Sequence, residues 1–346
     1  MVYARGKSPK TCATLLLQRM EKLESLKEAV LSIDADDFES LALQVFRHQA
    51  LHNPLYARFV AARKLRPEEV TSIRDIPFLP ISFFKHYDIR TGDWQADRYF
   101  ESSGTTGAQT SRHALQDPEF YKAASAKAFE AIYGPLDQYR IAALLPSYLE
   151  RGSSSLVFMA EHFIRESGSS DSGFFLDNTK ALNALLQKDA GGRKTLLLGV
   201  SFALLDFAEA FGAQSPDLLV METGGMKGRR REMIREELHE VLCSQMGLNS
   251  IHSEYGMTEL MSQAYAPSAG LFQPAPWMRI LIRDVNDPLS WQEEDRTGGI
   301  NIIDLANLHS CSFIETSDLG KAHPAGKVEI LGRFDNSDIR GCNLLI

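Results

Sequence analysis

The stretch "TLLLGVSFALLDFAEAFGAQSPDLLVMETGG", residues 195–225, decides the fold that this sequence predicts. It opens with a short apolar run at 195–201 and continues with a helical pattern at 202–213. A second apolar run at 217–225 ends in two glycines. Apolar runs of this length are typical of strands buried on both faces of a sheet. Strand, helix and strand in succession predict an α/β fold with a mainly parallel sheet.

The same alternation continues on both sides of this stretch. Residues 97–107 predict a strand that runs into a turn, and residues 138–146 predict a buried strand. Two helices are expected, at 117–134 behind Asp117 and Pro118, and at 229–247 before a closing glycine. Phosphate-type ligands bind in such folds where strands end and helices begin. Any binding site is therefore expected at the turns that follow the strands.

The two ends of the chain have different patterns. Up to about residue 75 the apolar spacing is helical, and "IPFLPISFFKHY" at 76–87 predicts a rigid extended segment because of its prolines and aromatic residues. Beyond 270, short β-patterned runs alternate with turns. We therefore expect three regions: a helical N-terminal region at 1–97, an α/β core at 98–269 and a smaller β-rich subdomain at 270–346.

Composition excludes several classes of protein. The 346 residues are 44% hydrophobic and 24% charged, as in soluble globular proteins, and a net charge of −8 argues against a nucleic-acid binder. The four cysteines are scattered without a C-x-x-C pair, so neither a disulfide framework nor a structural zinc site is expected. The apolar N-terminal stretch is too short for a signal peptide, and no stretch is long enough to span a bilayer. These features predict a cytoplasmic protein without membrane insertion.

The segment "ESSGTTGAQTSRH", residues 101–113, carries the first sign of chemistry. Its two glycines permit unusual backbone angles and close approach to a ligand, and its serines and threonines add hydroxyl donors. Successive amides in such a turn can surround an anion such as phosphate. The spacing differs from the Walker pattern because Gln109 stands where that pattern has its second glycine.

Four groups of motifs then follow in order: "SSGTTG" (102–107), "ETGGMKGR" (222–229), "EYGMTE" (254–259), and "ETSDLG" (315–320) with "GRFDNSDIRG" (332–341). Together they resemble the adenylate-forming superfamily, which includes acyl-CoA synthetases, luciferases and the adenylation domains of peptide synthetases. The motif "FFKHYDIRTG" and the terminal "RGCNLLI" are most similar to the acyl-protein synthetases of bacterial bioluminescence operons. The resemblance implies a large adenylate-forming catalytic domain whose α/β core binds the nucleotide.

The resemblance implies a reaction in which ATP and a carboxylic acid, expected to be a fatty acid, give acyl-AMP and pyrophosphate. It assigns the phosphates to the glycine loop, adenine stacking to Tyr255, the α-phosphate to Thr258 and Mg²⁺ to Glu259. Asp318 and Arg333 are expected at the ribose. The implied ATP-binding residues are Ser102, Ser103, Gly104, Thr105, Thr106, Gly107, Gly224, Gly225, Tyr255, Gly256, Thr258, Asp318 and Arg333.

The pattern departs from typical superfamily members at the end of the chain. Those members continue into a mobile domain whose lysine contacts the reacting groups, and this domain is expected to be absent here. Acyl-protein synthetases share that feature and carry an acyl-accepting cysteine near the C-terminus, which Cys342 matches. Thr258 and Cys342 are therefore the expected catalytic residues, with a reductase or a carrier protein as partner. Four cations could replace the lysine: Lys85, Arg112, Arg151 and Lys227.

Two other functions stay open at the level of sequence. The first is an acyl- or aryl-CoA ligase, or a carrier-protein ligase, that forms no covalent enzyme intermediate. The second is a non-catalytic scaffold of a biosynthetic complex, which the missing lysine domain favours and the intact motifs oppose.

Overall fold

The computed structural model describes residues 21, 23–102, 109–145, 152–175, 178–212, 217–224, 230–231 and 233–333. Most of the glycine loop lies outside the described residues, as do Gly225, Cys342 and the two candidate cations Arg151 and Lys227. The expected boundaries at 97 and 269 stay a prediction.

A single twelve-stranded sheet organises the described residues. Its first half contains five parallel strands, in the order β5 (Gly173–Phe174), β4 (Tyr139–Leu144), β6 (Lys194–Val200), β7 (Leu218–Thr223) and β8 (His252–Tyr255). Every residue of β4 is buried, as are six of the seven residues of β6, which explains their continuous apolar runs. The predicted α/β fold is confirmed, and its parallel strands form one half of a mixed sheet.

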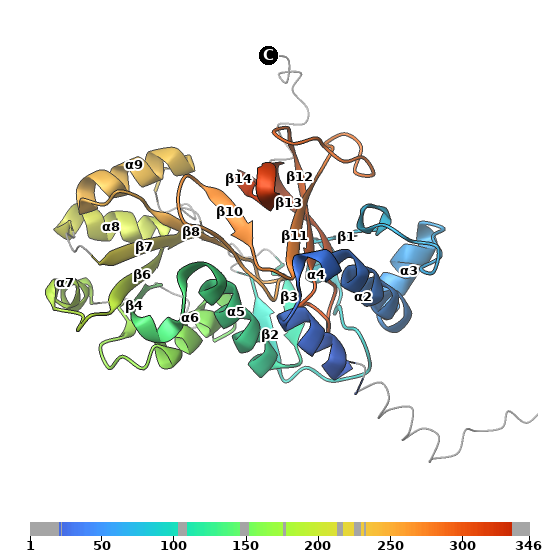
Figure 1. Ribbon diagram of the computed structural model, residues 1–346, viewed down its shortest axis with the longest axis horizontal. Helices are drawn as coiled ribbons and strands as arrows, with labels where there is room; N and C mark the ends of the chain where they lie inside the picture. The colour runs from blue at the N-terminus through green and yellow to red at the C-terminus, as the bar shows by residue number, and fades with distance from the viewer. Residues whose placement is uncertain are drawn as a thin grey trace, which may run out of the picture.

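Helices cover both faces of the parallel half (Figure 1). The helices α8 (Ser201–Phe211) and α9 (Arg235–Met246) lie on one side of the strands, and α5 (Pro118–Tyr133) and α6 (Ser155–Glu166) lie on the other; α7 (Thr179–Gln187) lies at the outer edge. Helix α5 begins where the sequence predicted, because Asp117 accepts a hydrogen bond from the Phe120 amide and Pro118 occupies the first helical position.

The second half of the sheet is antiparallel and continues from β8. It contains β9 (Ala264–Ala266), β10 (Leu271–Pro274), β14 (Val328–Arg333), β13 (Phe313–Ala322), β12 (Thr297–Asp304) and β11 (Met278–Arg283), in that order. The short strand β1 (Leu79–Pro80) pairs with β13 in parallel, and β2 (Arg98–Glu101) with β3 (Arg112–Leu115) forms a separate hairpin. Because β9 and β10 connect the two halves, residues from both can meet beside β8.

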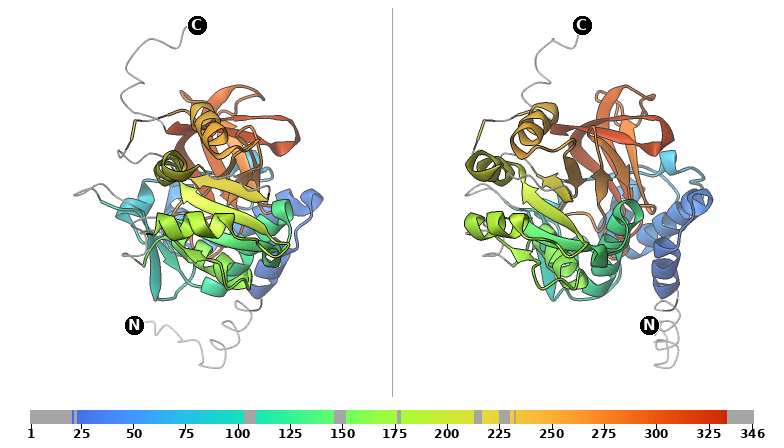
Figure 2. Two further views of the ribbon diagram at one scale, coloured as in Figure 1. Left: turned by 90° about the vertical axis from the view of Figure 1, so that its left-hand side faces the viewer. Right: turned by 60° about the vertical axis from the view of Figure 1, so that its left-hand side comes forward.

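The N-terminal helices pack against the antiparallel half (Figures 1 and 2). Residues 23–31 are helical, followed by α2 (Phe38–His52) and α3 (Pro54–Ala62). The buried Gln49 amide donates to the carbonyl oxygen of Asn307, and the Asn53 side chain both caps α3 and donates to the carbonyl oxygen of Ser310. These buried bonds fix the helical region to the segment after β12.

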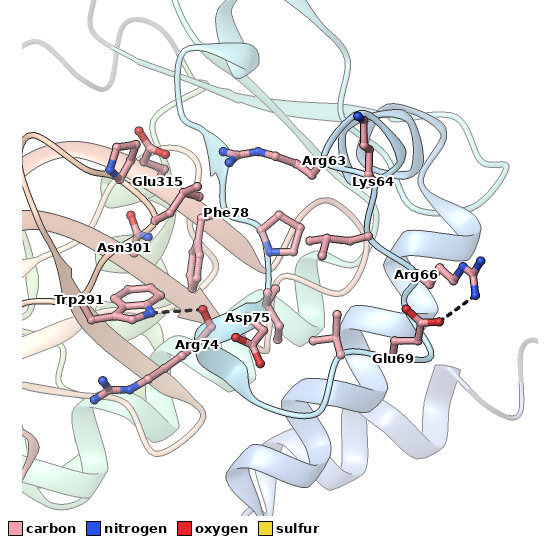
Figure 3. Close-up of a pocket in the computed structure, with 16 residues that line it drawn as sticks. Arg63, Lys64, Arg66, Glu69, Arg74, Asp75, Phe78, Trp291, Asn301 and Glu315 are labelled. Carbon is pink, nitrogen blue, oxygen red and sulfur yellow. Dashed lines mark hydrogen bonds and ion pairs between the residues drawn. The ribbon is translucent and has the colours of Figure 1, made fainter.

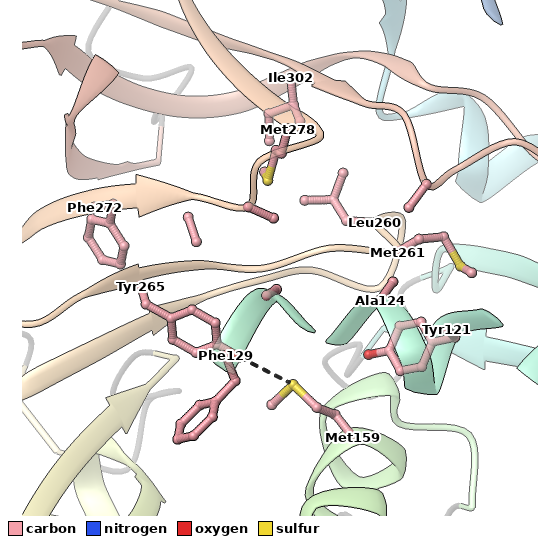
Figure 4. Packing of buried hydrophobic residues seen from close by; sticks show 14 of the residues in the cluster. Tyr121, Ala124, Phe129, Met159, Leu260, Met261, Tyr265, Phe272, Met278 and Ile302 are labelled. Atoms are coloured by element: carbon pink, nitrogen blue, oxygen red, sulfur yellow. Dashed lines mark hydrogen bonds between the residues drawn. The ribbon is translucent and has the colours of Figure 1, made fainter. Parts of the chain in front are cut away.

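One apolar core runs through the sheet (Figure 4). Near its centre, the Tyr265 ring of β9 meets Phe129 of α5 edge-on at 5.9 Å, and its hydroxyl lies 3.9 Å from the Met159 sulfur of α6. Farther along, Met278 and Ile302 continue the core into the antiparallel half. Within the described residues, no helix is long and apolar enough to cross a membrane.

Two sequence-based expectations were wrong in detail. Residues 76–87 are not extended throughout, because Phe83–His86 form the one-turn helix α4, and Phe84 is buried. The last proline of this segment is Pro80, at the end of β1, so no proline restricts the backbone of the residues that follow. Helix α9 begins at Arg235 rather than at 229; the Arg230 side chain instead pairs with Asp206 and Glu209 of α8.

Candidate active site

The ends of β6, β7 and β8 lie at one edge of the parallel half. Ser201, Gly224 and Tyr255 stand at these ends, and this is the edge where open α/β sheets bind ligands. Gly224 has φ of +71°, a backbone angle that favours glycine, so the chain turns sharply after β7. The Ser201 hydroxyl donates to the carbonyl oxygen of Gly224 and lies 3.3 Å from the Glu222 carboxylate. The buried side chains of Ser201 and Glu222 therefore support the backbone at Gly224.

A hydrogen bond joins two motifs that are far apart in sequence. The Tyr255 hydroxyl, at the end of β8, donates to the Asp318 carboxylate of β13 over 2.7 Å. Arg333 of β14 pairs with Asp318 in the strand register, and its Nε lies 3.7 Å from Oδ1 of Asp318. The Arg333 side chain is 86% exposed, so it stands at the rim, whereas Asp318 lies within. Three of the predicted ATP-binding residues thus meet at one place.

The Glu259 carboxylate belongs to the same group of charges. Burial raises the pKa of Glu259, while hydrogen bonding to Ser111 and the charge of Arg333 oppose that rise. Burial also raises the pKa of Asp318, against the Tyr255 hydrogen bond and the charge of Arg333. Both carboxylates are thus costly to ionise in the protein alone. A bound cation or ligand donor would offset this cost.

The backbone around Thr258 is held by two buried side chains. His113 Nδ1 lies 2.9 Å from the carbonyl oxygen of Thr258, and the Asn307 amide donates to the carbonyl oxygen of Glu259 over 2.8 Å. Burial lowers the pKa of His113 to about 4, so the ring is neutral near pH 7. His113 is therefore a neutral, hydrogen-bonded residue that supports the backbone of this turn. The side chains of Thr258 and Glu259 are held on a rigid turn.

The described start of the glycine loop lies close to this turn. Ser102 follows β2, and its hydroxyl accepts a hydrogen bond from the Ser111 amide, which closes the base of the loop. Ser111 also lowers the pKa of the Glu259 carboxyl, so the base of the loop is close to the charged group. Two of the four cations that could replace the lysine are described, and neither is paired with the charged group. Lys85 is exposed to solvent. Arg112 stacks over the Tyr99 ring at 4.0 Å and forms an ion pair with Glu101 at 3.4 Å.

Sequence reasoning missed Arg235, which connects several elements behind the site. Its Nε lies 3.4 Å from the buried Glu222 carboxylate, and its Nη1 donates to the carbonyl oxygen of Ile330 in β14 over 2.6 Å. The same guanidinium lies 4.9 Å from the centroid of the Phe272 ring, which contacts the Tyr255 ring edge-on at 6.0 Å. Arg235 and His239, one helical turn apart, both face Glu222. The four-residue spacing of Arg235 and His239 is visible in the sequence, but the sequence does not reveal that Glu222 is their common partner.

A second buried carboxylate lies directly before Tyr255. Glu254 accepts a hydrogen bond from the Thr223 hydroxyl, and a Cβ at Gly256 would lie 2.5 Å from its Oε1. A larger residue at Gly256 would therefore displace Glu254. Burial raises the pKa of Glu254 to about 7. Its charge state consequently changes near neutral pH, beside the candidate nucleotide site.

This shift predicts a pH dependence of stability. A carboxyl with a raised pKa stabilises the fold fully below its unfolded value of 4.5, and the contribution disappears as the pH rises through about 7. The loss amounts to about 3 kcal/mol over this window. Glu254→Gln keeps an acceptor for Thr223 and is expected to remove this part of the dependence. Urea unfolding at pH 4.5 and 7.5 measures the difference in the free energy of unfolding between the two pH values. Glu236→Gln, on the exposed side of α9, is the control and should show the same difference as the wild type.

No group of three or more histidine, cysteine, aspartate or glutamate side chains that could hold a metal ion occurs in the part of the chain that the structure describes. Glu259 offers a single buried carboxylate. Mg²⁺ bound to a nucleotide commonly takes one or two carboxylates and completes its shell with phosphate oxygens and water. The donor set fits that mode of binding.

Comparisons with known proteins concern the family and the fold of the chain. The sequence model of the family described as "Acyl-protein synthetase, LuxE" matches residues 31–346. No curated protein matches the chain. Among solved structures, the fold is shared with ATP-bound MatB from Rhodopseudomonas palustris, which has 19% identity and a TM-score of 0.51; the match covers 70% of this chain and 50% of MatB. This chain therefore spans about half the length of MatB.

Two further structures have the same fold. A 2-hydroxyisobutyryl-CoA ligase in complex with 2-HIB-AMP is 13% identical with a TM-score of 0.63, and the match covers 89% of this chain and 70% of that one. A long-chain-fatty-acid-CoA ligase (FadD1) from Archaeoglobus fulgidus is 16% identical with a TM-score of 0.51, covering 68% and 51%. At these identities the likeness establishes the fold.

Proposed function

The chain belongs to the LuxE family of acyl-protein synthetases, and from this premise we propose that it activates a carboxylic acid with ATP and passes the acyl group to a thiol. The observation that carries the proposal is the hydrogen bond from Tyr255 to Asp318, with Arg333 beside it. It unites three motif residues whose predicted roles all concern the nucleotide.

In the proposed reaction, an oxygen of the acid attacks the α-phosphorus of ATP, and pyrophosphate leaves. Asp318 would accept hydrogen bonds from the ribose, Arg333 would donate to it, and Tyr255 would stack on the adenine beside the turn at Gly224 and Gly256. Thr258 would donate to the α-phosphate from a turn that His113 and Asn307 keep rigid. Fixed donors of this kind stabilise charge that builds up at phosphorus.

Magnesium fits this arrangement as a proposal. Glu259 would hold the ion, which would neutralise charge on the phosphates. Burial raises the pKa of Glu259, so its carboxylate is costly to ionise in the protein alone, and a bound ion would offset that cost. Ser102, with the rest of the glycine loop at 103–107, would bind the departing phosphates.

The thiol step is assigned to Cys342, which lies outside the described residues. Its thiolate would attack the carbonyl carbon of acyl-AMP, forming a thioester and releasing AMP. A partner reductase or carrier protein would then receive the acyl group. Coenzyme A or a carrier-protein thiol as direct acceptor remains the second candidate, since the neighbouring folds include two CoA ligases.

ATP–pyrophosphate exchange tests the proposal. The protein is incubated with Mg²⁺, labelled pyrophosphate and single acids from acetate to palmitate, with phenylacetate included. We expect label in ATP that depends on the acid, with a fatty acid as the best substrate. Absence of exchange with every acid would contradict adenylation and favour the scaffold.

A further inference from the structure

Two buried polar side chains that the proposed reaction does not use lie at the end of β8. Successive side chains of a strand point to opposite faces of the sheet. Tyr255 points toward Asp318 and the proposed nucleotide site, whereas Glu254 lies opposite Tyr265 in the strand register. The Tyr265 ring packs against Phe129 of α5, so Glu254 is on the face that α5 and α6 cover. Glu254 and the residues predicted to bind the nucleotide therefore flank the end of β8 from two sides.

The Glu254 carboxylate is only partly satisfied by the protein. The Thr223 hydroxyl donates to its Oε2, and no other described residue hydrogen-bonds to the carboxylate. Its Oε1 lies over Gly256, 2.5 Å from the place where a Cβ would be, so the carboxylate extends along β8 toward the turn that carries Thr258. Burial raises the pKa of Glu254 to about 7, so the carboxyl group exists both with and without its proton near neutral pH.

Gln263, immediately before β9, is a second group with an incomplete set of partners. The residue is 4% exposed, and its Nε2 donates to the Tyr121 hydroxyl over 3.4 Å. Its Oε1 is buried and has no hydrogen-bond partner among the described residues. Exchange of the amide oxygen and nitrogen would leave the nitrogen at that place instead, so one atom of the amide lacks a partner in either orientation.

Glu254 and Gln263 both lie against Gly256. The Cγ of Gln263 lies 3.5 Å from the place where a Cβ would be at Gly256, which the Glu254 carboxylate also borders. Burial raises the pKa of Tyr121, the partner of Gln263, and the charge of Glu254 adds to this rise. A hydroxyl group suits both side chains, because it donates to a carboxylate or an amide oxygen and accepts from a carboxylic acid or an amide nitrogen. An ammonium group only donates.

The position of this pair fits the acid rather than the nucleotide. Acid and ATP must meet at the α-phosphate, which the proposed reaction assigns to Thr258. With the nucleotide on the Tyr255 side of β8, the acid is left with the opposite face, where the pair lies. A separate groove of about 510 Å³, between the loop after α3 and the antiparallel strands, is lined by Asp75 and Glu315, so it does not favour a carboxylate (Figure 3).

We propose that Glu254 and Gln263 bind a hydroxyl group of the acid, so that the preferred substrate is a fatty acid hydroxylated at the second or third carbon. The hydroxyl specifies the acid of the proposed adenylation, on which the proposal rests. It lies near the carboxyl end because Gly256 is only two positions from Thr258. An acid without the hydroxyl leaves the buried Gln263 amide unpaired, and sites of this kind discriminate against such analogues.

The test compares acids of equal chain length in ATP–pyrophosphate exchange by the full chain. The probes are dodecanoate, the separate enantiomers of 2-hydroxydodecanoate and 3-hydroxydodecanoate, and 3-aminododecanoate. We expect one hydroxylated enantiomer to exceed dodecanoate in kcat/KM at least about tenfold, because fixed side chains bind a hydroxyl of only one configuration. The amino acid is expected to be a poorer substrate than that enantiomer, since its ammonium group cannot accept a hydrogen bond.

Substitutions at Gln263 and Glu254 test whether these side chains cause the preference. Gln263→Met has a similar length but no amide, and it should remove the preference for the hydroxylated acid. Gln292→Met is the matched control, because the Gln292 amide bonds to Asp284 outside the candidate site, and it should keep the preference. Glu254→Gln retains an acceptor and a donor and should keep most of the preference, whereas Glu254→Leu should lose it.

Melting temperatures show whether each variant is folded, and the comparison of acids on the wild type is decisive even where a variant is not. Equal kcat/KM for dodecanoate and every hydroxylated enantiomer would overturn the proposal and assign the unpaired amide atom to water. Preference for the amino acid would overturn it in favour of an ammonium group, and a preference that survives Gln263→Met would place the hydroxyl elsewhere. Absence of exchange with every acid would instead contradict adenylation itself, which is a separate result.

Discussion

Asp318→Ala is expected to lower ATP–pyrophosphate exchange at least about a hundredfold. Asp318 accepts a hydrogen bond from Tyr255 and is the proposed acceptor for the ribose hydroxyls. Without its carboxylate, neither the Tyr255 ring nor the ribose would be held in position. Misplacement of a reacting group by about 1 Å can cost a hundredfold in rate. The fold should persist, because burial makes the Asp318 carboxylate costly and its removal relieves that cost.

Tyr255→Phe is the graded control for this prediction. It removes the hydroxyl that donates to Asp318 but keeps the ring next to Phe272 and the carboxylate itself. We expect about a tenfold loss, mostly in the KM for ATP. Unchanged exchange in a folded Asp318→Ala protein would show that the nucleotide binds elsewhere.

Arg235→Gln is expected to be the most destabilising of the substitutions considered. It leaves the Glu222 carboxylate, which is 8% exposed, without its guanidinium partner, and removal of one member of a buried pair costs about 3–5 kcal/mol. It also breaks the bond to Ile330 and the contact with Phe272, which supports Tyr255. We therefore expect a lower free energy of unfolding and, in the protein that folds, a raised KM for ATP with a smaller change in kcat.

Arg230→Gln is a matched control, because the side chains of Arg230 and Arg235 are both 24% exposed. The partners differ: Asp206 and Glu209 are 60% and 49% exposed, so solvent screens them and little stability should be lost. The double variant Glu222→Gln with Arg235→Gln should be more stable than Arg235→Gln alone, because no uncompensated carboxylate is then buried at position 222. Equal losses for the two single arginine variants in urea unfolding would contradict the role of Arg235.

The sequence predicted those parts of the fold that depend on neighbouring residues. The apolar runs at β6 and β7 and the cap at Asp117 are local patterns, and each appears where it was expected. Ordered motifs also predicted that Tyr255, Asp318 and Arg333 belong together. The structure confirms that they meet, while their roles toward ATP stay predictions.

What the sequence did not predict depends on distant partners. Arg235 and Ile330 are 95 positions apart, and their bond exists only because β10 and β14 continue the sheet beyond β9. Gln49 and Asn307 are 258 positions apart, and neither stands in a motif. Similarly, the shifted pKa of Glu254 comes from burial between strands, which residue type alone does not reveal.

Intact-protein mass spectrometry after incubation with ATP, Mg²⁺ and the preferred acid tests the central claim most directly. The account predicts a hydroxylamine-sensitive increase equal to one acyl group, present in the wild type and absent from both Cys342→Ser and Asp318→Ala. Acyl-AMP formation without any protein adduct would contradict the thioester on Cys342 and assign the acyl group to an external thiol.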